Sequence, residues 1–135
     1  MKISLGIIGG LKFRMTIIKD AEKLCTIINS EDEYRESIKS GKTLAFILQD
    51  NIDCCTSLVN NYTSDPDLKG ILDIYGINSI YLDATDSRLF KIFREEKVDC
   101  FPFIIAFEDG KRVGLLTANM HLGYFYDELE KWYEL

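Results

Sequence analysis

The order of strand-prone and helix-prone segments constrains the fold of this chain more than any single motif does. Residues 43–49 are nearly continuous apolar sequence, which is typical of a central strand buried on both faces. Further strand-prone runs occupy residues 24–28, 79–84, 103–108 and 112–117. Helix-prone segments occupy residues 31–40, 54–62, 65–76, 86–97 and 120–133. Strands and helices alternate until a hairpin and a last helix, so the sequence predicts an α/β sandwich in which helices cover both faces of a mixed sheet.

Local signals mark where several of these segments begin and end. Ser30 and Glu33 have the spacing of a capping box at the start of a helix. Asp65 is expected as the N-cap of a later helix, with Pro66 at its first helical position. An Asp-Gly pair at residues 109–110 predicts the turn between the last two strands.

Length and composition fit one globular domain. A chain of 135 residues, 47% of them hydrophobic, can bury a sizeable core. We expect the domain at residues 24–135 and an N-terminal extension at residues 1–23, either an added strand or a tail packed on the domain. Residues 1–13 contain a lysine and a short apolar run, but no small-residue cleavage site follows, and the run is too short to span a bilayer. Met15 is an alternative start for the chain.

Charge and cysteine content narrow the expected partners and compartment. With 22 acidic and 16 basic residues, the formal net charge is −6, which provides no electrostatic source of phosphate affinity. We therefore do not expect nucleic acid as a partner. A membrane is not expected either, because the N-terminal apolar run is too short to span one. The four cysteines lack the density and regular spacing of a disulfide framework, so a reducing compartment, the cytoplasm, is expected.

One long stretch resembles the C-terminal half of thioredoxins. Residues 89–114, LFKIFREEKVDCFPFIIAFEDGKRVG, match a helix followed by the family pattern V-x-x-[IMV]-P-T, a strand, a glycine turn and a strand ending in V-G. In element order the resemblance extends over residues 24–135. It implies a thioredoxin-like three-layer sandwich and makes Pro102 the family's cis-proline. Phe101 would then lie beside the cysteine loop, and both residues would shape a substrate groove.

The resemblance also implies a reactive centre at the start of the helix that follows the central strand. Cys54 and Cys55 stand there, but the sequence reads Cys-Cys-Thr-Ser in place of the family's C-x-x-C. We take Cys54 as the nucleophile, which leaves Ser57 where the resolving thiol would be. A helix N-terminus favours thiolate over thiol, whichever of the two cysteines is exposed. A stable bond between the adjacent cysteines is not expected, because their Cα atoms are about 3.8 Å apart and relaxed disulfides need roughly 4.4–6.8 Å.

The remaining cysteines and the single histidine carry weaker signals. Cys100, two residues before Pro102, is a candidate redox partner for Cys54 or Cys55, or for a second chain; an ordinary free thiol is the alternative. The cysteine spacing contains no C-x-x-C pair and His121 lies far along the chain, so no metal site is predicted. No cofactor is predicted.

Two functions remain open at this level. The first is a thiol–disulfide oxidoreductase of an atypical, non-C-x-x-C type that acts on protein thiols or disulfides. The second is a redox-inactive protein-interaction module that uses the same groove. Asp53, whose negative charge opposes ionisation of a neighbouring thiol, favours the second, as do the missing C-x-x-C and the absence of an acid in residues 43–49. We favour the redox-related role.

Overall fold

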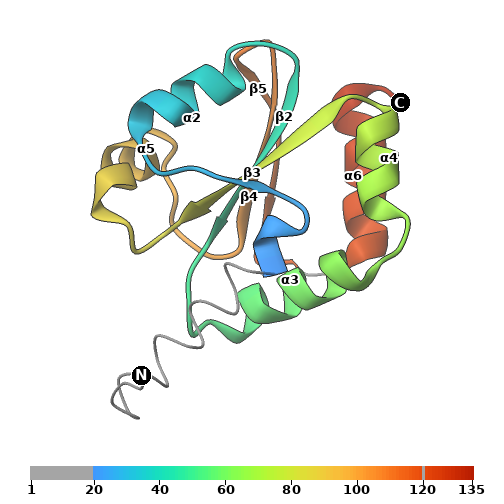
Figure 1. Ribbon diagram of the computed structural model, residues 1–135, viewed down its shortest axis with the longest axis horizontal. Helices are drawn as coiled ribbons and strands as arrows, with labels where there is room; N and C mark the ends of the chain where they lie inside the picture. The colour runs from blue at the N-terminus through green and yellow to red at the C-terminus, as the bar shows by residue number, and fades with distance from the viewer. Residues whose placement is uncertain (1–19, 120) are drawn as a thin grey trace.

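A mixed sheet forms the centre of the computed structural model, which describes residues 20–119 and 121–135 (Figure 1). The strand order is β1-β3-β2-β4-β5. The strands are β1 Thr26–Ile27, β2 Lys42–Leu48, β3 Ile77–Asp83, β4 Phe103–Glu108 and β5 Lys111–Thr117. The helices are α2 Glu31–Ile38, α3 Asp53–Ser64, α4 Leu68–Ile74, α5 Phe90–Glu95 and α6 Leu122–Tyr133, with a short 3-10 turn, η1, at Ser87–Leu89.

Helices cover both faces of the sheet. Helices α2 and α5 lie on one face, and α3, α4 and α6 lie on the other (Figure 1). Alternate residues of β2 supply the two hydrophobic cores: Leu44 and Phe46 face the α3, α4 and α6 side, whereas Ala45 and Ile47 face the α2 and α5 side. The predicted α/β sandwich and the doubly buried central strand are confirmed.

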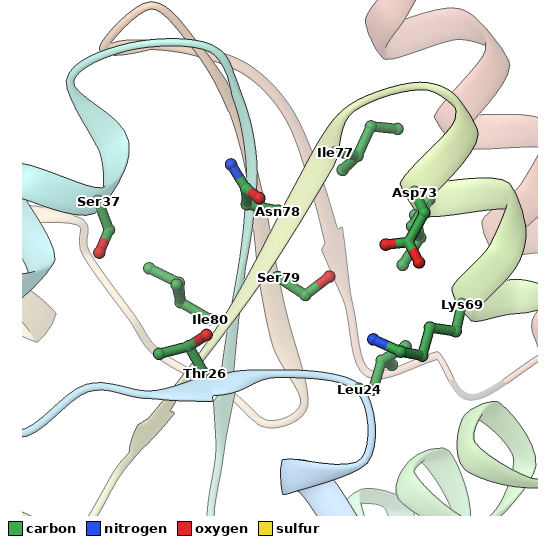
Figure 2. Close-up of a pocket in the computed structure, with 10 residues that line it drawn as sticks. Leu24, Thr26, Ser37, Lys69, Asp73, Ile77, Asn78, Ser79 and Ile80 are labelled. Atoms are coloured by element: carbon green, nitrogen blue, oxygen red, sulfur yellow. The ribbon is translucent and has the colours of Figure 1, made fainter.

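Strand pairing explains both the hairpin and an opening at one sheet edge. The turn between β4 and β5 has positive φ at Asp109 (52°) and Gly110 (82°), as the predicted Asp-Gly hairpin requires. At the other edge, β1 pairs in parallel only with Ile80 and Tyr81 of β3 among the described residues. On the side away from β2, the first half of β3 therefore has no described strand beside it, and a cavity opens there (Figure 2).

The first helix begins as the capping box predicts, but with a shifted second bond. Glu33 N donates to Ser30 Oγ at 3.1 Å, and Glu33 Oε1 accepts from Asn29 N at 2.7 Å. The glutamate thus satisfies the N–H of the residue before the N-cap.

The predicted start of α4 is wrong by two residues. The N-cap is Asp67, and Pro66 lies in the turn before the helix rather than at its first position. Asp65 still satisfies the free N–H groups, because its Oδ1 accepts from Asp67 N at 2.7 Å and from Leu68 N at 3.0 Å. The carboxylate reaches forward from an Asx turn, which the sequence pattern alone did not distinguish from an N-cap.

The structure describes only the last few residues of the predicted N-terminal extension, residues 1–23. Residues 1–19 lie outside the described residues, as does Met120. Residues 20–22 form one helical turn, and Cys25 N donates to Ala21 O at 2.7 Å, so the predicted strand at 24–28 is reduced to β1.

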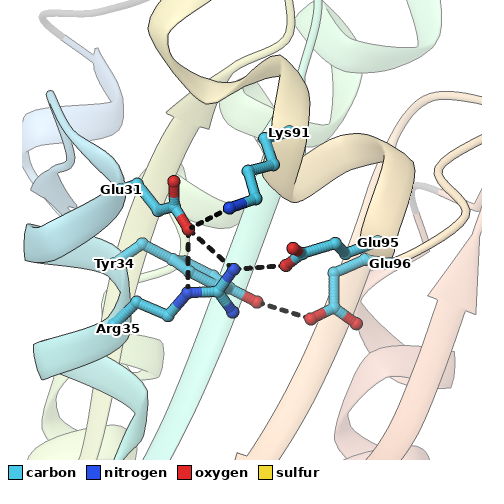
Figure 3. Close-up of polar contacts among 6 residues, drawn as sticks. All are labelled: Glu31, Tyr34, Arg35, Lys91, Glu95 and Glu96. Atoms are coloured by element: carbon cyan, nitrogen blue, oxygen red, sulfur yellow. Dashed lines mark hydrogen bonds and ion pairs between the residues drawn. The ribbon is translucent and has the colours of Figure 1, made fainter.

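Charged side chains join α2 to α5 at the surface (Figure 3). Arg35 pairs with Glu31 at 3.0 Å and also with Glu95, and Lys91 approaches Glu31 at 3.8 Å. These side chains are partly or largely exposed, and such pairs usually contribute less than about 1 kcal/mol each. They orient α5 against α2 more than they stabilise the fold.

Tyr34 provides the buried part of the same contact. Its ring is fully buried and packs edge-on against Phe107, with ring centroids 6.2 Å apart. Its hydroxyl donates to Glu96 Oε2 at 3.0 Å (Figure 3). Burial, followed by the Glu96 charge and hydrogen bond, raises the pKa of Tyr34, so the hydroxyl remains a donor.

Helix α6 packs on the hairpin through one glycine and one tyrosine. A Cβ atom at Gly114 in β5 would lie 2.2 Å from the Trp132 ring. Tyr133 donates from its hydroxyl to the carbonyl oxygens of Thr43 at 3.0 Å and Phe107 at 3.1 Å, so α6 is tied to both β2 and β4.

We expect Gly114→Ala to lower the free energy of unfolding by about 1–3 kcal/mol, because the Trp132 ring must leave its place on β5. Gly70→Ala in α4 is the matched control. No atom lies within 4 Å of a Cβ there, so the helix should gain about 0.5–1 kcal/mol. Urea denaturation measures both. An unchanged unfolding midpoint for Gly114→Ala would contradict the tight packing of Trp132.

Candidate functional site

The cysteine pair lies in the first turn of α3. Ile52 is the N-cap, and its side chain makes no capping hydrogen bond. The N–H of Cys55 donates to Ile52 O at 3.0 Å and closes the turn. Cys54 therefore lies at the positive end of the helix dipole.

Cys55 points into the core. Its side chain is fully buried on the α3, α4 and α6 side of the sheet, and Gln49 N donates to its Sγ at 3.5 Å. Burial raises the pKa of Cys55; the Gln49 hydrogen bond opposes this rise, and the charges of Cys54 and Asp50 add to it. Cys55 is thus a neutral, inaccessible thiol at neutral pH.

Cys54 is the accessible member of the pair. It is half-buried, and Ser57, one helical turn later, is exposed. All four cysteines of the described residues are free thiols. The structure therefore resolves which adjacent cysteine reaches solvent, a point that the sequence left open.

The register of the sheet brings the loop that contains Pro102 to the end of the sheet where α3 and the cysteine pair begin. Ile47 near the end of β2 pairs with Phe103 at the start of β4, so Pro102 lies beside the chain that leads from β2 into α3. The Phe101–Pro102 peptide bond is cis, and Pro102 O accepts from Ala118 N at 2.8 Å.

Phe101 is half-buried and packs against both hydrophobic cores. The ring is therefore neither fully exposed nor fully buried. Part of it remains at the surface beside Pro102, and part closes the end of the core.

Cys100 belongs to the other side of the sheet. It is half-buried and packs on the α2 and α5 core, whereas Cys55 lies in the opposite core. Burial raises the pKa of Cys100, a hydrogen bond and charge from Asp99 raise it further, and a hydrogen bond with Thr117 lowers it. A redox partnership of Cys100 with Cys54 or with a second chain stays a prediction, and the sheet argues against Cys55 as its partner.

The other candidate ligands and thiols are scattered. Cys25 is half-buried against the core; burial raises its pKa, and the charge of Lys69 partly opposes this. His121 is exposed at the N-cap of α6. Within the described ranges, no three His, Cys, Asp or Glu side chains are grouped so that they could hold a metal ion. No helix in that part of the chain is long and apolar enough to cross a bilayer.

Asp50 is a residue of this site that the sequence reasoning missed. It follows β2 by two positions and is only 5% exposed. Its charge raises the pKa of Cys55 and, after the larger effects of burial and of Asp83, also that of Tyr81. The sequence reasoning looked for an acid within the strand, where there is none. The sequence signal for Asp50 was its place directly after the long apolar run of residues 43–49.

We expect iodoacetamide to modify Cys54 in the folded protein and to modify Cys55 at least about tenfold more slowly, since Cys55 reacts only after local opening. Because its pKa is raised, Cys55 should remain mostly thiol up to about pH 8.5, so its labelling should stay slower than that of Cys54 across this range. Peptide mass spectrometry identifies the modified sulfur, and urea-unfolded protein, in which both should react alike, is the control. Preferential modification of Cys55 would contradict this geometry.

Comparison with known proteins supports the fold. No protein-family model matches the chain, and no curated protein matches its sequence. Thioredoxin from Plasmodium falciparum has a TM-score of 0.65 at 15% identity, with 78% of this chain and 97% of that chain covered. Thioredoxin from Trypanosoma brucei brucei also has a TM-score of 0.65, at 18% identity, with coverages of 82% and 92%.

A third match comes from a structural study of thiol resolution in yeast mitochondrial 1-Cys peroxiredoxin via the glutathione and thioredoxin systems. Its TM-score is 0.62 at 18% identity, and the match covers 79% of this chain and 94% of that chain. Identities this low establish the fold alone. The chain has a thioredoxin-like fold.

Proposed function

We propose that the protein exchanges thiols and disulfides through Cys54 acting as a single thiol. The observation that carries the proposal is the different placement of the adjacent cysteines. Cys54 is accessible at the helix N-terminus, on the same end of the sheet as Phe101 and Pro102, while Cys55 is buried and neutral.

The chemistry needs one sulfur from the protein and one external thiol. The Cys54 thiolate attacks a substrate disulfide, whose S–S bond breaks as the Cys54–substrate disulfide forms. The departing substrate sulfur leaves with the electron pair and takes up a proton. A low-molecular-weight thiol of the glutathione class then attacks the mixed disulfide, so Cys54 is released as a thiolate and a disulfide forms between that thiol and the substrate.

Three residues near Cys54 have properties that support thiol–disulfide exchange. Ser57 is exposed one turn away and offers a hydroxyl in place of a second thiol. Protein thiols or disulfides would bind along the surface beside Phe101 and Pro102. A free Cys54 needs a reducing compartment, and the cytoplasm is the one we propose.

Glutathione disulfide is the first test. We expect one glutathione adduct on Cys54, retained in Cys55→Ser and lost in Cys54→Ser, because Cys54 alone of the three half-buried cysteines lies at the N-terminus of a described helix. Intact-mass and peptide mass spectrometry measure the adduct. Absence of an adduct on the folded wild-type protein would refute the proposal.

A gain of function gives a second test. Ser57→Cys places a thiol one helical turn from Cys54 on the same face, where it can resolve a mixed disulfide at high effective concentration. We expect dithiothreitol-dependent insulin reduction to rise about tenfold or more. Ser64→Cys, the same substitution at the far end of α3, is the control and should have no effect. Equal activities of the two variants would contradict a reactive Cys54.

A protein-interaction module without exchange activity is the second candidate. The exposed carboxylate of Asp53 stands next to Cys54, a charge that a purely redox centre has no use for. If Cys54 forms no adduct, this role should appear as a partner interaction weakened by Phe101→Asp. Tyr75→Asp is the matched control, because Tyr75 is 46% exposed at the C-cap of α4, which leads into the opposite, amino end of β3.

A further inference from the structure

The charges around Cys54 carry an inference about the substrates of the proposed exchange reaction, and the inference rests on that reaction. Strands β2 and β3 are parallel and end together, and the antiparallel strand β4 begins at the same end of the sheet. The chain segments at this end are residues 49–57, which include Cys54, and residues 83–87 and 98–102. A disulfide that reaches Cys54 therefore approaches the sheet at the end where these segments lie.

Aspartate is the only charged residue type in these three segments. The aspartates are Asp50, Asp53, Asp83, Asp86 and Asp99. Arg88, just beyond the second segment, pairs with Asp86 at 2.7 Å and offsets that one charge. Asp53 and Asp99 are exposed, and neither forms an ion pair with a described residue. The end of the sheet that holds Cys54 is therefore negatively charged.

This negative charge already acts on buried groups at the same end. Burial is the main cause of the raised pKa of Cys55 and of Tyr81, and the Asp50 charge raises both further. The Asp83 charge also raises the pKa of Tyr81. The carboxylates are thus close enough to one another to act on a charged group that arrives at Cys54.

Asp53 has the most direct position. It adjoins Cys54 in the first turn of α3, with its carboxylate in solvent. Its charge opposes formation of the thiolate, so the exchange step as such gains nothing from it. An approaching substrate with a positive charge does gain. An ammonium group three bonds from a disulfide sulfur can come within about 8 Å of this carboxylate, the Debye length at physiological ionic strength, so salt does not remove the attraction.

We propose that Cys54 exchanges preferentially with protein disulfides that are flanked by lysine or arginine, and that Asp53 is the main residue that sets this preference. The Cys54 thiolate attacks one sulfur of the basic disulfide, whose S–S bond breaks as the mixed disulfide forms. The departing sulfur takes the electron pair and then a proton. The basic side chain of the substrate stays next to Asp53 in the mixed disulfide. Glutathione disulfide, which carries net negative charge, forms the same adduct more slowly.

Three small disulfides of different charge test the preference. Cystamine has an ammonium group on each half, 2-hydroxyethyl disulfide is neutral, and 3,3′-dithiodipropionate has a carboxylate on each half. Mass spectrometry of the Cys54 peptide after acid quenching gives the rate of adduct formation with each. The rate with cystamine, divided by the rate with the neutral disulfide, should fall at least about threefold between ionic strengths of about 0.01 M and 1 M, because the Debye length shortens from about 30 Å to about 3 Å. The corresponding ratio for the dicarboxylate should rise.

Asp53→Asn tests the assigned residue. We expect it to lower the ratio for cystamine about three- to tenfold and to raise the ratio for the dicarboxylate, as the loss of one charge at short range predicts. Division by the rate with the neutral disulfide cancels any change in the reactivity of Cys54 itself. Asp73→Asn, the same substitution on α4 near the amino end of β3, should leave both ratios unchanged. Unfolding midpoints establish that both variants are folded, since a carboxylate in the first turn also stabilises a helix.

The possible outcomes separate this inference from the exchange reaction. If the neutral disulfide forms an adduct on Cys54 but the ratios do not change in Asp53→Asn, the exchange reaction stands and the preference is overturned. Equal changes in Asp53→Asn and Asp73→Asn would attribute the effect to the net charge of the chain, and would overturn the role of Asp53. Absence of an adduct with the neutral disulfide would refute the exchange reaction, and the inference with it.

Discussion

Burial of β2 on both faces is the constraint on which the rest of the structure depends. Its alternating residues enter two separate cores, so neither helical layer can be removed without exposing the strand. β2 also pairs with β3 on one side and with β4 on the other, in opposite senses. The end of this one strand therefore determines where α3 begins and where the loop before β4 arrives.

The helix that carries the two adjacent cysteines determines where each side chain points. Consecutive residues on an α-helix point about 100° apart, so the two cysteines point in different directions. Cys55 takes the inward direction and is held neutral by burial, with Asp50 nearby. Cys54 is left at the rim, in the first turn of α3. The pair therefore places one thiol in the core and one at the surface.

The two ends of the sheet have different chemistry for a topological reason. At the carboxyl end of β2 the chain turns into α3, which supplies a helix N-terminus and a sulfur. At the amino end of β3 the short β1 leaves an edge open, and α4 directs a lysine and an aspartate toward it. Pairing β1 over its whole predicted length would have covered much of that edge. The Cys25 N–H instead donates to Ala21 O of the helical turn at residues 20–22, which keeps residues 24 and 25 out of the strand and leaves the cavity in place.

Sequence alone determined the element order, the doubly buried strand, the Asp-Gly hairpin and the position of the cysteine pair at a helix start. These depend on local periodicity and turn chemistry, which act over a few residues. Tertiary structure decided the rest. It determined which cysteine is exposed, that Cys100 lies on the opposite side of the sheet from Cys55, that Asp50 is buried, and that Asp53, Asp83 and Asp99 lie at the same end of the sheet. Each of these facts depends on how segments far apart in the chain pack together, and a side chain's burial and neighbours are set by that packing, which the local pattern does not encode.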